Sequence, residues 1–276
     1  MRMSRRARIG LGVSATTIVV LALAPVVWIV SLSFKQGDDI NNKQFWPTHW
    51  SWENYKTVFE THLFTSALRN SLGISLIATT ISVVLAMFAA YAVTRLDFPG
   101  RRFVLISAMA VTVFPAISIA TPLFNLWRTI GLYDTWAGLV IPYLALTLPL
   151  SMWTLTSFFR QIPRELEQAA QVDGATTWQA FRRVLVPLAT PGVFTTAILA
   201  FFCAWNDFVF GITLTSTDRA RPVPAALAFF SGDSQFQQPT AAISAAAVVV
   251  TIPVIVLVLL FQRRIVAGLT SGAVKG

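Results

Sequence analysis

The stretch IPRELEQAAQVDGATTWQAFRRVLVPLATP, residues 162–191, is polar in a chain whose neighbouring segments are apolar. Pro163 suits a first helical position, and Glu165 and Glu167 would put negative charge in the first turn, where the helix macrodipole favours it. Gly174 stands where a helix needs a left-handed residue after its last turn, and Thr176-x-x-Gln179 forms a capping box for a second helix. The sequence therefore predicts a helix–turn–helix held at a membrane surface.

The composition excludes an ordinary soluble domain. Of 276 residues, 55% are hydrophobic and 12% are charged, and the mean hydropathy is +0.65. The net charge of +9 does not indicate nucleic-acid binding, because the cations flank apolar runs instead of forming one basic face. The single cysteine, Cys203, excludes an intrachain disulfide and argues against a zinc site. We expect an all-α integral protein of the cell membrane with no metal or cofactor of its own.

Six apolar runs are long enough to cross a bilayer. They cover residues 9–34, 67–93, 103–125, 136–157, 192–214 and 241–262. The first run continues past a short segment that resembles a signal-peptide cleavage site, so we expect an uncleaved helix. Prolines inside the third and fourth runs predict kinks or interruptions there. The expected organisation is a first helix with a polar loop (1–66), a five-helix core that carries the 162–191 loop (67–262) and a tail (263–276).

The distribution of basic residues predicts the orientation of these six spans. With the N-terminus in the cytoplasm, 14 of the 21 basic residues fall on the cytoplasmic side. They are Arg2, Arg5, Arg6, Arg8, Arg95, Arg101, Arg102, Arg160, Arg164, Arg182, Arg183, Arg263, Arg264 and Lys275. This bias in short loops predicts that both termini and the 162–191 loop are cytoplasmic.

The loop between the first two spans, residues 35–65, is rich in aromatic side chains, including Trp46, Trp50, Trp52 and Tyr55. Such rings favour the membrane–water interface, and they could equally stack on a carbohydrate. We favour the interface, since the loop adjoins membrane spans.

Motifs for catalysis are missing from the sequence. Nothing matches G-x-x-x-x-G-K-[ST], a G-x-S-x-G elbow or an H-E-x-x-H helix. We therefore expect that this chain is not an enzyme.

The 162–191 stretch is similar to the EAA loop of binding-protein-dependent ABC importer permeases, which docks into a cytoplasmic ATPase. The matching residues are Glu167, Gln168, Ala169, Ala170, Asp173, Gly174, Ala175, Phe181, Pro187 and Pro191. Where the family pattern places glutamate this sequence has Gln168, and Glu167 stands one position earlier. The resemblance implies that these residues couple the permease to its ATPase.

Two further segments resemble the maltose-type permease subunit of carbohydrate-uptake ABC importers. The ending from Gly268 through Gly272 to Lys275 looks like that subunit's G-L-T-x-G-A-V-K-G tail, which implies an ATPase contact; composition alone predicts a pliant or frayed terminus. The loop before the last span lies where that subunit contacts its solute-binding protein. The residues that could make this contact are Gly232, Asp233, Gln235 and Gln237.

Trp205, Asn206 and Asp207 form a polar group inside the fifth apolar run, in a pattern similar to one in sugar-class permeases. An aspartate within a membrane span should face the protein interior or water. Two interpretations stay open. These residues line a translocation path for sugar hydroxyls, or they bond neighbouring helices and hold the bundle together.

The resemblance implies a permease subunit of the maltose and trehalose types, importing a disaccharide. It implies a second homologous permease, two ATPase subunits that bind Mg-ATP, a solute-binding protein, membrane lipid around the spans and no nucleic acid. The main alternative is an ion-coupled secondary transporter that uses Asp207 as a relay, although no inverted repeat supports it. A membrane enzyme or structural subunit is a further alternative.

Overall fold

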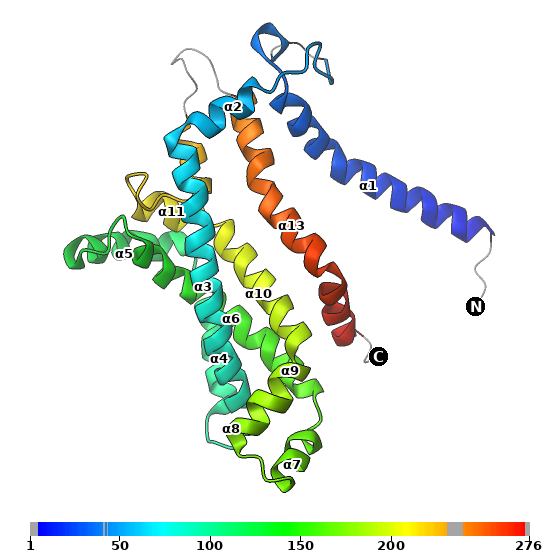
Figure 1. Cartoon of the computed structure of the whole chain (residues 1–276), viewed down its shortest axis with the longest axis vertical. Coiled ribbons are helices and arrows are strands. Elements are labelled where there is room, and N and C mark those ends of the chain that lie inside the picture. The colour runs from blue at the N-terminus through cyan, green and yellow to red at the C-terminus, as the bar shows by residue number, and fades with distance from the viewer. Residues whose placement is uncertain (1–4, 41, 43, 231–239, 274–276) are drawn as a thin grey trace. The chain divides into compact units, whose positions relative to one another are not determined.

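The computed structural model describes residues 5–40, 42, 44–230 and 240–273, which form helices and turns with no strand among them. They fall into two compact units, Met1–Thr65 with Phe229–Ile252 and Ser66–Ala228 with Pro253–Gly276. Figure 1 traces the elements of both. The all-α class predicted from the sequence is confirmed.

The first unit contains α1 (Arg5–Ser33), a 3-10 turn η1 (Gly37–Ile40) and α2 (Glu53–Glu60). Lys35 follows α1 and is completely buried. Its ammonium donates to Asn42 Oδ1 at 3.0 Å and to the Gln44 carbonyl at 2.6 Å, and it lies 5.3 Å from the centre of the Trp28 ring. A buried charge is tolerated only when it is bonded in this way, so Lys35 organises the loop around itself.

Asp39 completes this loop. Its carboxylate accepts from the Thr48 backbone N–H at 2.9 Å and from the Asn42 amide. Partial desolvation raises the pKa of Asp39. Together these hydrogen bonds lower the pKa by more than desolvation raises it, so the net pKa lies below the usual value. Trp46, Trp50 and Trp52 remain exposed, which leaves both interpretations of the aromatic loop open.

The second unit is a bundle of long and short helices. It holds most of α3 (His62–Arg95), then α4 (Arg101–Val111), α5 (Ala116–Ile130), α6 (Trp136–Gln161), α7 (Glu165–Val172), α8 (Thr177–Ala180), the π-helical turn η2 (Phe181–Leu185), α9 (Val186–Leu188), α10 (Thr190–Trp205), α11 (Val209–Leu214), α12 (Val223–Ala228) and the end of α13 (Thr240–Ala273).

Two of the predicted spans are broken, the third as its prolines predicted and the fifth without such a signal. In place of the third there are two helices, α4 and α5, bent by 87° at Pro115, which precedes the first residue of α5. In place of the fifth, α10 ends at Trp205 and a short helix, α11, follows. Proline cannot donate a backbone hydrogen bond, which explains the first break.

The interruption predicted in the fourth span is wrong, because α6 continues through Pro142 and Pro149. Pro142 cannot donate to the carbonyl of Gly138, four residues earlier. The indole N–H of Trp127 donates to that carbonyl instead, at 2.7 Å. A side chain of α5 thus satisfies the group that the proline leaves free, which is how membrane helices accommodate this residue.

Four helices are long and apolar enough to cross a membrane, and the number rises to six if each bent pair counts as one span. The second bent pair joins Thr177–Leu188 to Thr190–Trp205 at 72°. The chain is therefore a multi-pass membrane protein.

The second unit has a core at each end of α3. One cluster centres on Ile74, Tyr143 and Phe210, and the other on Ala90, Phe159 and Leu185. Gly192 lets α10 approach α6 closely, because a Cβ there would lie 2.4 Å from the Phe158 ring.

At the α11 end of this unit, Asn70 of α3 bonds three partners. Its amide donates to the Asp218 carbonyl at 2.9 Å and to the Arg221 carbonyl at 3.1 Å. Its Oδ1 accepts from the Trp136 indole at 3.0 Å. One fully buried side chain therefore joins α3 to α6 and to the α11–α12 loop.

Candidate functional site

The predicted helix–turn–helix is present, with α7 as its first helix. The helix begins at Glu165, two residues after the expected Pro163, and carries Glu165 and Glu167 in its first turn. Gly174 follows it with φ +88°, in the left-handed region. The N–H of Ala175 donates to the Ala170 carbonyl at 2.9 Å and the N–H of Gly174 to the Gln171 carbonyl at 3.0 Å. This is a Schellman ending, as the glycine predicted.

The second helix begins with the predicted capping box. Thr176 Oγ1 accepts from the Gln179 N–H at 3.2 Å, and Gln179 Oε1 accepts from the Thr176 N–H at 2.9 Å. One turn later the helix widens, because the Val186 N–H bonds the Phe181 carbonyl five residues back. A single π turn of this kind is frequent at functional sites.

Phe181 is the buried anchor of the loop. It is 5% exposed, and its ring centre lies 4.9 Å from that of Tyr91 and 5.8 Å from that of Phe88, both on α3. Trp178 stacks on Phe181 at 5.4 Å and remains half exposed. The second helix of the loop is thus packed on α3 through aromatic contacts.

The first helix is held to the end of α3 by charge. Arg95, the last residue of α3, pairs with Glu167, and both side chains are 8% exposed. Arg95 also donates to the Ile162 carbonyl at 2.9 Å, and Arg164 donates to the Thr94 carbonyl. Glu167 therefore has a partner within the chain, and its part in coupling to an ATPase stays a prediction.

The outer face of the loop is open. Gln168, Ala169 and Asp173 are exposed, and so is Gly174. Val172 at the tip of α7 is 87% exposed. Val172 is thus an exposed apolar side chain among polar neighbours.

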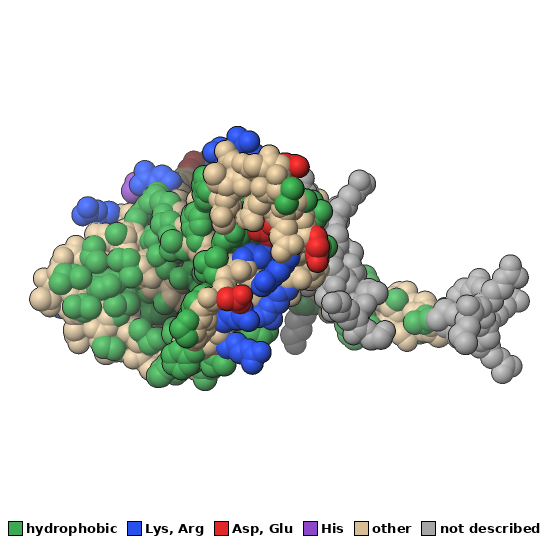
Figure 2. Space-filling view, turned by 90° about the horizontal axis from the view of Figure 1, so that it is seen from below, with side chains coloured by type: hydrophobic (Ala, Val, Ile, Leu, Met, Phe, Trp, Pro, Cys, Tyr) green, Lys and Arg blue, Asp and Glu red, His purple; other side chains and the backbone are tan. Residues whose placement is uncertain are grey.

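Leu166 extends the apolar surface near the start of α7 and is 44% exposed. Viewed from this end, Lys and Arg side chains gather beside the loop (Figure 2). Pro187 is also exposed, on α9. The composition of the stretch predicted the polar face, whereas nothing in the motif singled out Val172.

The polar group of the fifth run lies at the break between α10 and α11. Asp207 Oδ2 accepts from the N–H groups of Phe210 and Gly211, each at 3.1 Å, and so caps α11. Asn206 is exposed and donates to the Phe202 carbonyl at 2.8 Å, while Trp205 is buried. These contacts give Asp207 a structural task, and a role in a translocation path stays a prediction.

The remaining predicted contacts lie near or beyond the described residues. Gly232, Asp233, Gln235 and Gln237 lie outside them, as does Lys275. Gly268 and Gly272 fall within α13, so the tail that the composition predicted to be pliant is helical through Ala273.

A family model described as the binding-protein-dependent transport system inner membrane component matches residues 82–271. The chain belongs to this family. Members are transport components and not catalytic units. The residues of the 162–191 loop that carried the resemblance lie inside the matched range, whereas Gly272 and Lys275 of the tail lie beyond it. Membership also argues against the ion-coupled secondary transporter considered above.

Close relatives are sugar permeases by name. The trehalose transport system permease protein SugB of Mycobacterium tuberculosis is 55% identical over 261 residues, 95% of each chain. The trehalose/maltose transport system permease protein MalG of Thermococcus litoralis is 37% identical, over 98% of this chain and 97% of that one. The sulfoquinovosyl glycerol transport system permease protein SmoH of Agrobacterium fabrum is 38% identical, over 96% and 93%.

Solved structures agree on the fold. A chain of a bacterial ABC transporter that imports the acidic polysaccharide alginate superposes with a TM-score of 0.79 at 24% identity, covering 95% of this chain and 99% of that one. A chain of the inward-facing MetNI methionine ABC transporter gives 0.61 at 16% identity, covering 79% and 99%. The chain has the fold of an ABC importer permease.

Proposed function

We propose that this chain is one of two different permease subunits of a sugar importer, and that trehalose is its sugar. The names of the relatives support this, above all the trehalose permease that is 55% identical over 95% of the chain. By the same inference the complex contains a second homologous permease, two cytoplasmic ATPase subunits and an extracytoplasmic solute-binding protein. Mg-ATP binds the ATPase subunits, and this chain binds no cofactor.

The observation that carries the proposal is the construction of the loop at residues 162–191. It is braced on α3 by Phe181 and by the Arg95–Glu167 pair, while Val172 at its tip is left open. Because α7 is held to α3 in this way, a displacement of its exposed end can move α3 without bending the loop. In this proposal Val172, Gln168, Ala169 and Asp173 contact the ATPase, and the buried contacts pass its motion to α3.

We further propose six spans with both termini in the cytoplasm. In chain order, the two bent helix pairs supply the third and fifth spans. The excess of arginine at the α7 end supports a cytoplasmic loop, as ATPase docking requires. The tail with Gly268, Gly272 and Lys275 then lies on the same side as the ATPase and contacts it.

The sugar path is proposed to pass beside the α10–α11 break. Asn206 is exposed there, and its carboxamide can bond hydroxyl groups. Asp207 caps the start of α11 and is proposed to lie beside the path. The loop that holds Gly232, Asp233, Gln235 and Gln237 is proposed to meet the solute-binding protein on the opposite face.

The test is uptake of labelled trehalose by the reconstituted complex, measured together with ATP hydrolysis. Val172→Ser removes the exposed apolar tip, and Val113→Ser is its matched control, because Val113 is 80% exposed in the α4–α5 bend. Burial of a valine is worth about 1.5 kcal/mol or more, so ATPase docking and uptake should fall roughly tenfold in the Val172 variant. The control should keep both.

Two results would overturn the proposal. If uptake follows an ion gradient in the absence of ATP, the chain is not part of an ATP-driven importer. If the complex takes up labelled maltose with ATP hydrolysis but does not take up labelled trehalose, the assignment of the sugar is wrong.

A further inference from the structure

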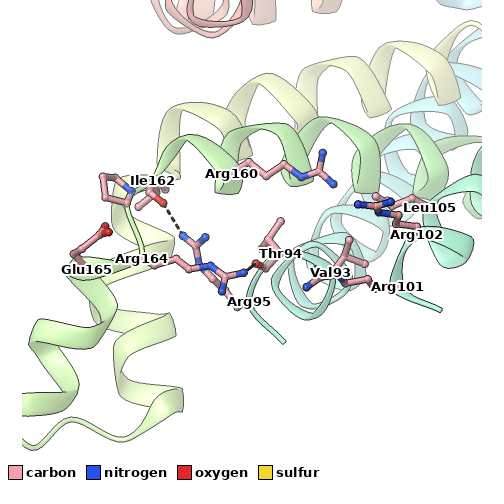
Figure 3. A pocket seen from close by; sticks show the side chains of 11 residues that line it. Val93, Thr94, Arg95, Arg101, Arg102, Leu105, Arg160, Ile162, Arg164 and Glu165 are labelled. Atoms are coloured by element: carbon pink, nitrogen blue, oxygen red, sulfur yellow. Dashed lines mark hydrogen bonds between the residues drawn. The ribbon is translucent and has the colours of Figure 1, made fainter. Parts of the chain in front are cut away.

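A basic pocket of about 580 Å³ opens beside the start of the loop (Figure 3). Its wall is formed by the end of α3, the start of α4, the end of α6 and the residues that lead into α7. The charged residues that line it are Arg95, Arg101, Arg102, Arg160, Arg164 and Glu165. Five guanidinium groups from four segments of the chain thus meet around one hollow.

Most of this positive charge is not neutralised by the protein. Arg95 pairs with Glu167, and Arg101 pairs with Asp97 at 2.5 Å. Arg164 bonds only a carbonyl among the described residues, that of Thr94.

Arg102 and Arg160 are exposed, and within the described part of the chain the side chain of neither makes a hydrogen bond or an ion pair. Glu165 is the one acidic residue in the wall. Three arginines without a carboxylate partner therefore face a single free carboxylate, and the pocket should attract an anion.

The surface beside the pocket is apolar. On α4, directly after Arg101 and Arg102, Phe103 is 72% exposed and Ile106 is 65% exposed. Basic residues at the cytoplasmic ends of spans are common, but that tendency alone does not gather them around a hollow. An anionic group joined to an apolar chain matches both features, since basic pockets between membrane helices bind anionic lipid head groups.

We propose that this pocket binds the phosphate of an anionic phospholipid, with the acyl chains lying along α4. Arg102 and Arg160 hold the phosphate, and Arg164 closes the pocket on the side of the loop. Because Arg164 and Arg95 also hold the residues leading into α7, a bound lipid fastens the coupling loop to the bilayer surface.

The experiment measures lipid retention on the complex purified through this chain, by native mass spectrometry after exchange into nanodiscs of phosphatidylglycerol and phosphatidylcholine. The variant is Arg102→Gln with Arg160→Gln. Each arginine near the bilayer surface contributes roughly fivefold to anionic-lipid binding, so loss of both should weaken phosphatidylglycerol binding about 30-fold. Phosphatidylcholine retention should not change.

The matched control is Arg182→Gln with Arg183→Gln, which removes the same charge from a different hollow of the same loop. It should retain phosphatidylglycerol as the wild type does. Glu165→Gln should act in the opposite direction and strengthen retention, because it removes the carboxylate that opposes the phosphate. This opposite effect separates a bound anion from a loss of folding.

Three outcomes would overturn the inference. One is equal phosphatidylglycerol retention by both double variants. The second is retention of inorganic phosphate by the complex in detergent, together with equal retention of phosphatidylglycerol and phosphatidylcholine. That result would make the pocket a site for soluble anions. The third is loss of other subunits from the Arg102/Arg160 variant with lipid retention unchanged, which would make it a protein contact. None of these depends on transport, so failure here leaves the proposed function untouched.

Discussion

Replacing Glu167 by alanine should release the first turn of α7 from the end of α3. The substitution leaves Arg95, whose side chain is 8% exposed, with only the Ile162 carbonyl as a partner. Removal of one partner from a buried pair costs about 3–5 kcal/mol. The retained carbonyl bond places this case at the lower limit, and about 3 kcal/mol corresponds to a roughly 100-fold larger opening constant for this turn.

Hydrogen exchange measures this opening directly. The N–H groups of Glu167 and Gln168 bond the Arg164 carbonyl at 3.0 and 3.1 Å, so the exchange of this segment reports whether the turn is closed. Peptides covering it should exchange about 100-fold faster in the variant. Glu165→Ala is the control, since that exposed glutamate should change stability by only about 0.5 kcal/mol or less.

The double variant Arg95→Met with Glu167→Leu should restore slow exchange, because an apolar pair of similar size avoids the uncompensated charge. Exchange in Glu167→Ala that matches the Glu165→Ala control would refute the reasoning. In that case the pair would contribute nothing to holding α7.

Four more predictions follow from single positions. Gly174→Ala should destabilise the loop by about 1–2 kcal/mol through its left-handed backbone alone, since no atom lies within 4 Å of the added Cβ, and Gly174→Asn should cost less in a thermal unfolding assay. Gly192→Ala should cost about 1–3 kcal/mol in the same assay because its Cβ would meet the Phe158 ring, and Phe158→Leu should recover most of it; a stable single variant would contradict the close approach of α6 and α10. Asp207→Ala should cost about 0.5–2 kcal/mol by removing the cap of α11 whereas Asp207→Asn should remain folded, and loss of trehalose uptake in the asparagine variant would show that the carboxylate serves more than the cap. The pKa of Asp39 is lowered, so its contribution to loop stability should be complete above the ordinary value of 3.8 and disappear as the pH falls below that value. Tryptophan fluorescence should report this loss of stability, and Asp39→Asn should abolish the pH dependence.

Local chemistry explains which parts of the site were predictable. The Schellman ending at Gly174 and the capping box at Thr176 depend on residues within a few positions of one another, so the sequence alone was sufficient. The bond between Arg95 and Glu167 joins residues 72 positions apart, and no spacing rule connects them. Sequence reasoning therefore placed the loop correctly but did not identify the partner of Glu167 within the chain.

The prolines and the fifth apolar run show the same limit. The position of a proline is evident from the sequence. Its effect on a helix depends on whether a donor from elsewhere in the fold bonds the backbone carbonyl four residues earlier, which the proline leaves free. Pro142 has such a donor in Trp127, and α6 continues, whereas the chain turns at Pro115. After the break at Trp205, Asp207 caps the start of α11. The hydropathy pattern shows this aspartate only as a polar residue within an apolar run.

Helix α3 is tied down near both of its ends within the second unit. Arg95 fastens one end to the 162–191 loop, and Asn70 fastens the other to α6 and the α11–α12 loop. At 1.5 Å per residue these two anchors are roughly 38 Å apart, so a rotation of about 5° at one would carry the other by about 3 Å. In the proposed importer α3 acts as a lever, so that a displacement of α7 moves the α11 end of the bundle with it. The two anchoring side chains, Arg95 and Asn70, set the direction of that movement.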